Sequence, residues 1–160
     1  MAVAYLLAGT NIGNKTNNLI RALNLIEQSG LTLIKKSSIY ESSPWGFNHP
    51  ESFYNQAFGI RTDLLPEFLL STLLDIEKQM GRIRTTGQYE ARIIDLDILF
   101  YDDLQLQTLS LSLPHPLLHL RRFALEPLCE IAPSIIHPIF NKTVRVLLQE
   151  CTDTGSVTRI

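Results

Sequence analysis

Apolar residues along the 160-residue chain follow two different periods, which predict four strands and two long helices. Short apolar or β-branched runs that end in turn residues predict strands at 3–8, 31–40, 53–61 and 93–101. Apolar residues then recur with helical spacing between a candidate N-cap at Asn14 and a helix-ending glycine at Gly30. A second amphipathic helix is expected over 66–80.

Beyond the fourth strand, the pattern predicts a partly helical segment at 117–130 and a last helix at 144–151. The segments 42–50 and 81–91 are expected to be loops, because they are rich in turn residues or lack an apolar period. The order strand, helix, strand, strand, helix, strand is that of the βαββαβ unit. We therefore expect an α+β protein with a ferredoxin-like βαββαβ core and a C-terminal helical and strand extension, in one domain over 1–160.

Composition and charge exclude several classes of protein. Fourteen Lys and Arg against sixteen Asp and Glu give a formal net charge of −2, which excludes a broadly basic nucleic-acid-binding surface. No apolar run is long enough to cross a membrane, and the first residues lack the charged start of a secretory signal. Cys129 and Cys151 have no metal-ligand spacing. We expect a cytoplasmic protein with no nucleic-acid, membrane or obligate protein partner.

The clearest chemical signal is a pair of aspartates in the fourth predicted strand. Side chains alternate across a strand, so Asp95 and Asp97 should emerge on one face while their neighbours point into the core. The two carboxylates then lie roughly 6.5–7 Å apart along the chain. They repel each other unless a cation intervenes, and Mg²⁺ is bound by carboxylates together with phosphate oxygens. The alternative is a pair of solvated aspartates on an exposed strand face.

Arginines gather around these aspartates in the sequence. Five of them fall within one stretch of the chain: Arg82, Arg84, Arg92, Arg121 and Arg122. The planar guanidinium recognises phosphate through paired hydrogen bonds, so the combination suits transfer of a phosphate-containing group. A solvated arginine-rich loop is the alternative. The chain has no G-x-x-x-x-G-K-[ST] motif, which excludes a P-loop.

Aromatic residues supply a third signal. Phe53 and Phe123 stand in separate segments beside polar residues, and two rings can enclose a planar heterocycle whose edge bonds to an amide such as Asn55. Ordinary core packing is the alternative for both rings. Trp45 lies in a loop, where a large apolar side chain often covers a ligand or a neighbouring surface.

Three blocks of the chain resemble the 6-hydroxymethyl-7,8-dihydropterin pyrophosphokinases, a family of folate biosynthesis. The most specific block is Arg92-x-x-Asp95-Leu96-Asp97-Ile98-Leu99. The others are Ser38-x-Tyr40-x-Ser42-x-Pro44 with Phe53-x-Asn55-x-Ala57, and Pro114-His115-Pro116 with Arg121-x-Phe123. The blocks occur in the family's order, and the resemblance covers nearly the whole chain.

This resemblance implies a transferase that moves pyrophosphate from ATP to the hydroxymethyl group of 6-hydroxymethyl-7,8-dihydropterin and releases AMP. It implies that Asp95 and Asp97 hold two Mg²⁺ ions that bridge the ATP phosphates, and that Arg82 and Arg92 are catalytic. The residues that it places against ATP are Glu77, Arg84, Tyr89, Ile98, Ser112, His115 and Arg121. Those that it places against the pterin are Ser42, Ser43, Trp45, Phe53, Asn55 and Phe123.

The chain departs from the family pattern on the nucleotide side. Leu74 stands where a glutamine can contact ATP, Ser110 where some members have an arginine, and 89–91 where a Trp-Gly-Pro run is common. We expect these changes to weaken nucleotide affinity and to leave the reaction type unchanged.

Two other functions stay open from the residues alone. A ferredoxin-like module that binds a ligand without chemistry would share the fold and the aromatic residues, but it would not explain why aspartates and arginines converge. Another Mg²⁺-dependent transferase, such as a nucleotidyltransferase, would share the aspartates and release pyrophosphate in place of AMP.

Overall fold

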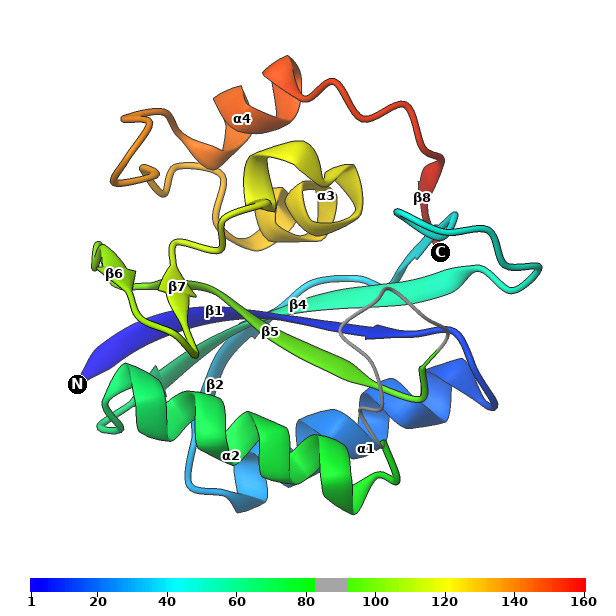
Figure 1. The fold of residues 1–160 in the computed structure, drawn as a ribbon, viewed down its shortest axis with the longest axis horizontal. Coiled ribbons are helices and arrows are strands. Elements are labelled where there is room, and N and C mark those ends of the chain that lie inside the picture. Colours follow the sequence, from blue (N-terminus) through cyan, green and yellow to red (C-terminus); the bar gives the residue numbers. More distant parts are fainter. Residues whose placement is uncertain (83–91) are drawn as a thin grey trace.

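A computed structural model describes residues 1–82 and 92–160, and its element order confirms the predicted ferredoxin-like core (Figure 1). The core comprises β1 (Ala2–Thr10), α1 (Lys15–Gln28), β2 (Thr32–Lys36), β3 (Tyr40–Ser42), β4 (Phe53–Thr62), α2 (Pro66–Gln79) and β5 (Asp95–Tyr101). The C-terminal extension comprises β6 (Leu106–Gln107), β7 (Ser112–Leu113), a 3-10 turn (Leu118–Leu120), α3 (Arg122–Ile131), α4 (Val144–Glu150) and β8 (Val157–Arg159).

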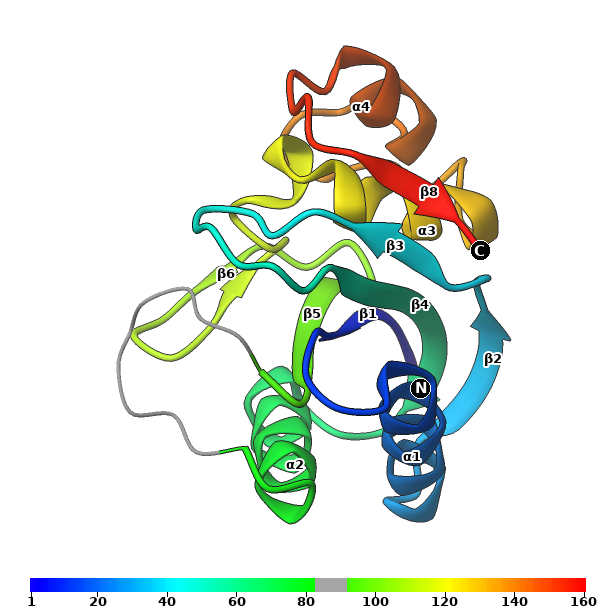
Figure 2. The ribbon, with the colours of Figure 1, turned by 90° about the vertical axis from the view of Figure 1, so that its right-hand side faces the viewer.

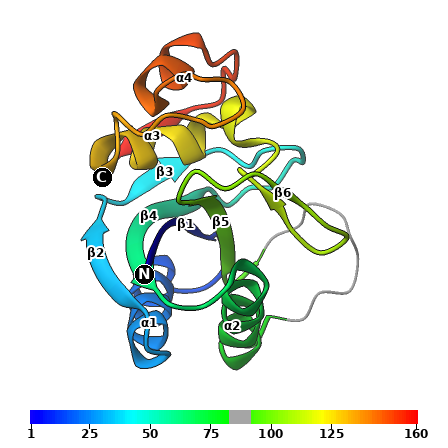
Figure 3. The same cartoon turned by 90° about the vertical axis from the view of Figure 1, so that its left-hand side faces the viewer.

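The central sheet is antiparallel and runs in the order β5-β1-β4-β3-β8, with β2 also paired to β4. This order places β1 and β4 at the centre and β5 at an edge. Helices α1 and α2 cover one face of the sheet, and α3 covers the other with α4 packed outside it (Figures 2 and 3). The tail strand β8 lies beside β3 and closes the sheet on that side.

The prediction of one strand over 31–40 is wrong, because the structure divides this segment into β2 and β3. Both strands pair with β4. Compared with β4, however, the segment carries one extra residue within β2 and another before Tyr40. At the break, the Ser37 N–H donates to the Ala57 carbonyl and the Ser37 Oγ accepts from the Ala57 N–H, both at 2.9 Å. A serine hydroxyl that bonds the neighbouring backbone in this way replaces a ladder bond, and the extra residues bulge the strand.

Local sequence explains where the helices begin. The Asn14 Oδ1 accepts from the Asn17 N–H at 3.1 Å and caps α1, as predicted. Thr143 caps α4 through the Val146 N–H. Pro66 begins α2, where its missing N–H leaves no hydrogen bond unmade. Over residues 1–82 and 92–160, none of the helices is long and apolar enough to span a membrane.

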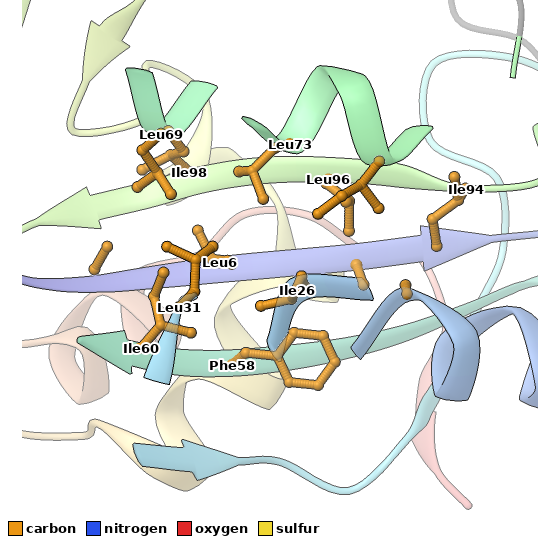
Figure 4. Packing of buried hydrophobic residues seen from close by; sticks show 14 of the residues in the cluster. Leu6, Ile26, Leu31, Phe58, Ile60, Leu69, Leu73, Ile94, Leu96 and Ile98 are labelled. Carbon is orange, nitrogen blue, oxygen red and sulfur yellow. The ribbon is translucent and has the colours of Figure 1, made fainter. Parts of the chain in front are cut away.

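Buried side chains form one cluster on each face of the sheet. The first lies under α1 and α2 and includes Leu6, Phe58 and Ile98 (Figure 4). The second lies under α3 and α4 and includes Leu7 and Phe100. Because successive side chains of a strand point to opposite faces, the neighbours Leu6 and Leu7 belong to different clusters. The central strands are therefore enclosed on both faces, and they hold in place the side chains that project from their ends.

Candidate active site

Two pockets lie beside β5, and among the described residues they have only Asp97 in common. The first, which we call the aromatic pocket, is lined by Leu7, Gly9, Ser42, Ser43, Trp45, Phe53, Asn55, Arg92, Asp95, Asp97, Arg121 and Phe123. The second, which we call the hairpin pocket because the turn between β6 and β7 forms one wall, is lined by Leu70, Leu74, Leu96, Asp97, Ile98, Thr108, Leu109, Ser110, Leu111, Ser112, His115 and Pro116.

Asp95 and Asp97 emerge from β5 on one face, as the alternation predicts. Their neighbours Ile94, Leu96 and Ile98 are at most 4% exposed and pack toward α2 (Figure 4). The β5 core thus fixes the direction of both carboxylates. They do not lie on a fully exposed strand face, because both line a pocket and the Asp95 side chain is only 18% exposed.

Both arginines that the resemblance makes catalytic hold Asp95. The Arg92 Nη1 donates to the Asp95 Oδ2 at 2.9 Å, and the Arg82 Nη1 donates to the Asp95 Oδ1. Arg82 also donates to the Ile94 carbonyl at 3.1 Å. The two arginine side chains are only 8% and 14% exposed, so these charge-assisted bonds lie in a partly desolvated site.

Asp97 differs from Asp95, because no described residue forms an ion pair or a hydrogen bond with its carboxylate. Burial raises the pKa of Asp97, the charge on Asp95 raises it further, and Arg121 lowers it. A bound cation would favour the ionised form of Asp97 and so lower its raised pKa. Within residues 1–82 and 92–160 no group of three or more His, Cys, Asp and Glu side chains surrounds one point. The pair suits Mg²⁺, which commonly takes one or two carboxylates and completes its shell with phosphate oxygens and water.

Asn55 presents an amide oxygen to the aromatic pocket. Its Nδ2 donates to the Ser42 Oγ at 2.7 Å and to the Tyr40 carbonyl at 3.3 Å, and the side chain is 2% exposed. No described residue donates to the Asn55 Oδ1, which lies next to Gly9. The amide is thus held in one orientation, with its acceptor directed at the pocket.

Rings and guanidinium groups alternate around the aromatic pocket. Arg121 lies over Trp45 at 4.6 Å and over Phe123 at 5.6 Å, while Arg92 lies over Phe53 at 5.6 Å. The rings of Trp45 and Phe123 meet edge to face at 6.4 Å. The structure therefore brings all six predicted pterin residues into one pocket, and it adds Arg121, which the resemblance places against ATP.

The hairpin pocket gathers three of the predicted ATP residues, namely Ile98, Ser112 and His115. The His115 Nδ1 accepts from the Leu117 N–H at 3.1 Å. Burial lowers the pKa of His115 to about 4, the charge of Arg121 lowers it as well, and Asp95 acts in the opposite direction. At neutral pH this histidine is uncharged and carries its proton on Nε2, as a hydrogen-bond donor.

Glu77 is another predicted ATP residue. Glu77 lines neither pocket: its Oε2 accepts from the Leu96 N–H at 2.8 Å, and its Oε1 lies 3.2 Å from the Arg82 Nη1. It is 2% exposed, so in this structure it positions Arg82 and β5. Arg84 and Tyr89 lie outside the described residues, as do Glu90 and Ala91.

Two residues of the site, Gly9 and Asn11, were not predicted from the sequence. Gly9 lines the aromatic pocket. Asn11 is 1% exposed and bonds Arg92 in both directions: its Oδ1 accepts from the Arg92 N–H at 2.8 Å, and its N–H donates to the Arg92 carbonyl at 3.1 Å. For Asn11, the signal available in the sequence was a polar residue directly after a buried strand.

Paired carboxylates and arginines beside two pockets are typical of enzymes that act on phosphate-containing substrates. The family model for 7,8-dihydro-6-hydroxymethylpterin-pyrophosphokinase (HPPK) matches residues 5–133. A 2-amino-4-hydroxy-6-hydroxymethyldihydropteridine pyrophosphokinase of Aquifex aeolicus is 38% identical over 152 residues, which cover 95% of this chain and 94% of that protein. The chain belongs to this family and is a pyrophosphokinase of folate biosynthesis.

Two further similar proteins are longer than this chain. The folic acid synthesis protein FOL1 of Dictyostelium discoideum is 37% identical over 99% of this chain, which spans only 24% of that protein. The crystal structure of wild-type Plasmodium falciparum HPPK-DHPS superposes with a TM-score of 0.74 at 19% identity, over 93% of this chain and 44% of that one. This second likeness confirms the fold alone.

Proposed function

We propose that this chain transfers pyrophosphate from ATP to 6-hydroxymethyl-7,8-dihydropterin, giving the pterin diphosphate and AMP. The hydroxymethyl oxygen bonds to the β-phosphorus, the bond from that phosphorus to the oxygen bridging the α-phosphate breaks, and the hydroxyl proton is lost. The observation that carries the proposal is the position of Asp97 in both pockets. Ligands bound in the two pockets would meet at the β5 carboxylates, where the transferred group must pass.

The aromatic pocket suits the pterin. A planar, apolar-faced ring with polar edges fits between Phe53 and Phe123, with Trp45 at the side. The Asn55 Oδ1 would accept from an N–H at the ring edge, and Ser42 and Ser43 offer further polar groups. Because Asn55 is already held through its Nδ2 by Ser42 and Tyr40, it loses little freedom when the pterin binds.

The hairpin pocket suits the nucleotide. His115 supplies a neutral Nε2–H donor, and Ser112 and Ile98 stand beside it. Leu74 and Ser110 line the same pocket without positive charge, and the Ser110 Oγ donates to the Glu67 Oε2 at 2.7 Å. This supports the expectation of weaker nucleotide affinity than in family members with a glutamine and an arginine there.

The residues that would hold Mg²⁺ are Asp95 and Asp97, and we propose two ions shared with the ATP phosphates. Bound Mg²⁺ would neutralise phosphate charge and align the transferred group with its acceptor. Arg82 and Arg92 bond the Asp95 carboxylate in this structure. From this position the two guanidinium groups would bond the phosphate oxygens of ATP and stabilise the charge that develops during transfer. Arg121, between the rings and the carboxylates, adds a third positive charge.

An assay for AMP from ATP and Mg²⁺, with and without the hydroxymethyl dihydropterin, tests the proposal. AMP that forms only with the pterin supports it. Release of inorganic pyrophosphate would indicate a nucleotidyltransferase, and pterin binding without turnover would indicate a binding module. A cytoplasmic location, and the absence of nucleic-acid and obligate protein partners, stay predictions.

A further inference from the structure

We propose that Asp153 is a positioning residue for the pterin, because it holds the C-terminal segment 151–160 against both walls of the aromatic pocket. This inference rests on the proposed function, since it takes the pterin to bind in that pocket. The segment lies beyond the residues that the family model matches, which end at Pro133. The role of the segment therefore follows from its contacts in this chain.

The segment holds the first wall through backbone pairing. Strand β8 pairs with β3, with Val157 opposite Ser42 (Figure 2). One residue further along, the Ser43 N–H donates to the Ser156 carbonyl at 3.2 Å. Ser42 and Ser43 both line the aromatic pocket, so the tail fixes the backbone on which they stand.

The segment holds the second wall through Arg122, the residue before Phe123. The Arg122 N–H donates to the Asp153 Oδ2 at 3.1 Å. The Arg122 side chain also donates to the tail: its Nε donates to the Asp153 carbonyl at 3.0 Å, and its Nη2 donates to the Cys151 carbonyl at 3.1 Å. The side chain of Arg121, at the N-cap, makes no capping bond to α3. Asp153 therefore supplies this bond from outside the helix and fixes the turn that presents Phe123 to the pocket.

A tight turn connects the two attachments. The Asp153 Oδ1 accepts from the Gly155 N–H at 2.9 Å, and this turn brings Ser156 to Ser43. A Cβ on Gly155 would lie 3.1 Å from the Asp153 Oδ1 and 3.3 Å from the Ser43 Oγ. A third pocket lies between the tail, Trp45 and Phe123, so the two walls have room to move apart if the tail is released.

Loss of Asp153 should therefore weaken the pterin and spare the nucleotide. With the tail released, Phe123 and the Ser42–Ser43 backbone must be ordered when the pterin binds, and that ordering reduces affinity. The hairpin pocket shares none of these contacts. We expect the Asp153→Ala variant to raise the dissociation constant of 6-hydroxymethyl-7,8-dihydropterin about tenfold, the size of one lost bond to a charged acceptor. The KM for ATP should stay within about twofold of the wild-type value.

The experiment compares titration calorimetry with the pterin, and KM values for both substrates, in five proteins. These are the wild type, Asp153→Ala, Asp153→Asn, Gly155→Ala and the control Asp103→Ala. Asp103 is an exposed carboxylate in the turn after β5. Asp153→Asn retains an oxygen acceptor and should recover most of the affinity. Gly155→Ala crowds Asp153 and Ser43 without removing a bonding group, so it tests the same contact if Asp153→Ala folds poorly.

Three results would overturn the inference. In the first, pterin affinity is unchanged in Asp153→Ala and Gly155→Ala although the wild type binds and turns over. In the second, the KM values for pterin and ATP rise together, which would indicate a general loss of structure. In the third, Asp103→Ala has the same effect. Failure of the wild type itself to bind the pterin would instead refute the proposed function, on which the inference rests.

Discussion

Replacing Gly9 with alanine should weaken pterin binding while leaving the fold about as stable. Gly9 of β1 lies opposite Asn55 of β4. An added Cβ would lie 3.3 Å from the Asn55 Oδ1 and 3.9 Å from the Phe53 Cδ1. The φ of Gly9 is not in the left-handed region, so alanine can adopt this backbone. The effect of the substitution is therefore steric and directed at the acceptor proposed for the pterin.

The structure sets the size of this effect. The Asn55 amide cannot turn away freely, because its Nδ2 is held by Ser42 and Tyr40. A shift of a few tenths of an ångström, or a crowded approach to Oδ1, costs the pterin up to one neutral hydrogen bond, about 0.5–1.5 kcal/mol. That is about a two- to tenfold rise in its dissociation constant. The unfolded chain loses freedom on Gly→Ala substitution, which stabilises the fold by about 0.4–1 kcal/mol and offsets the crowding.

Pterin titration calorimetry and urea unfolding of the Gly9→Ala variant measure the two effects separately. Gly59→Ala is the matched control, because its Cβ would lie 3.2 Å from the Tyr5 Cε1, and neither residue lines either pocket. Unchanged pterin affinity in Gly9→Ala would refute the role given to Asn55. An equal loss in Gly59→Ala would show that crowding anywhere in the sheet is sufficient.

Three further changes test other parts of the structure. Asp97→Asn removes the charge between the pockets at constant size, and we expect kcat for AMP release at saturating Mg²⁺ to fall about 100-fold or more. Glu77→Ala strips a buried partner from Arg82 and should lower the free energy of unfolding in urea by about 3 kcal/mol. Burial raises the pKa of Glu130, but hydrogen bonds, the first from Tyr40, outweigh it and lower the pKa below its usual value. The stability that Glu130 contributes at neutral pH should therefore be lost on acidification, so the difference between wild type and Glu130→Gln should shrink from about pH 6 to about pH 3.

Each of these has a contrary outcome. Near-normal turnover of Asp97→Asn would remove Asp97 from the metal site. A stable Glu77→Ala variant would show that Arg82 and the Leu96 N–H find other partners, and Glu77→Gln, which keeps an acceptor, is its milder control. A constant stability difference across pH for Glu130→Gln would show that this carboxyl is not held by its hydrogen bonds.

The sequence predicted the fold well where local periodicity decides which face of a strand or helix a side chain occupies. The alternation around Asp95 and Asp97 was sufficient to place both on one face of a buried strand. The single strand expected over 31–40 was wrong, because the pattern of β-branched residues does not show that Ser37 bonds Ala57 across the sheet. Such a contact depends on register, which a one-dimensional pattern does not contain.

Much of the candidate site was also accessible from the residues, although the support around it was not. The aromatic residues and the aspartates stand out in the sequence itself. By contrast, the sequence grouped Arg122 with the other arginines, and the structure turns it away to hold the tail. Glu77 likewise supports Arg82. It also accepts a hydrogen bond from the Leu96 N–H, although it lies 19 residues earlier in the chain, on α2. These roles arise from long-range packing, which has no local signature.

The position of β5 at the edge of the sheet has a consequence for self-association. An edge strand exposes backbone groups that can pair with another chain and begin aggregation. Here the Leu96 N–H is already bonded to the Glu77 carboxylate, and the Leu99 carbonyl accepts from the His115 N–H at 3.0 Å. These two backbone groups are therefore unavailable to a foreign strand, and the edge of β5 is a poorer template for pairing than a bare strand would be.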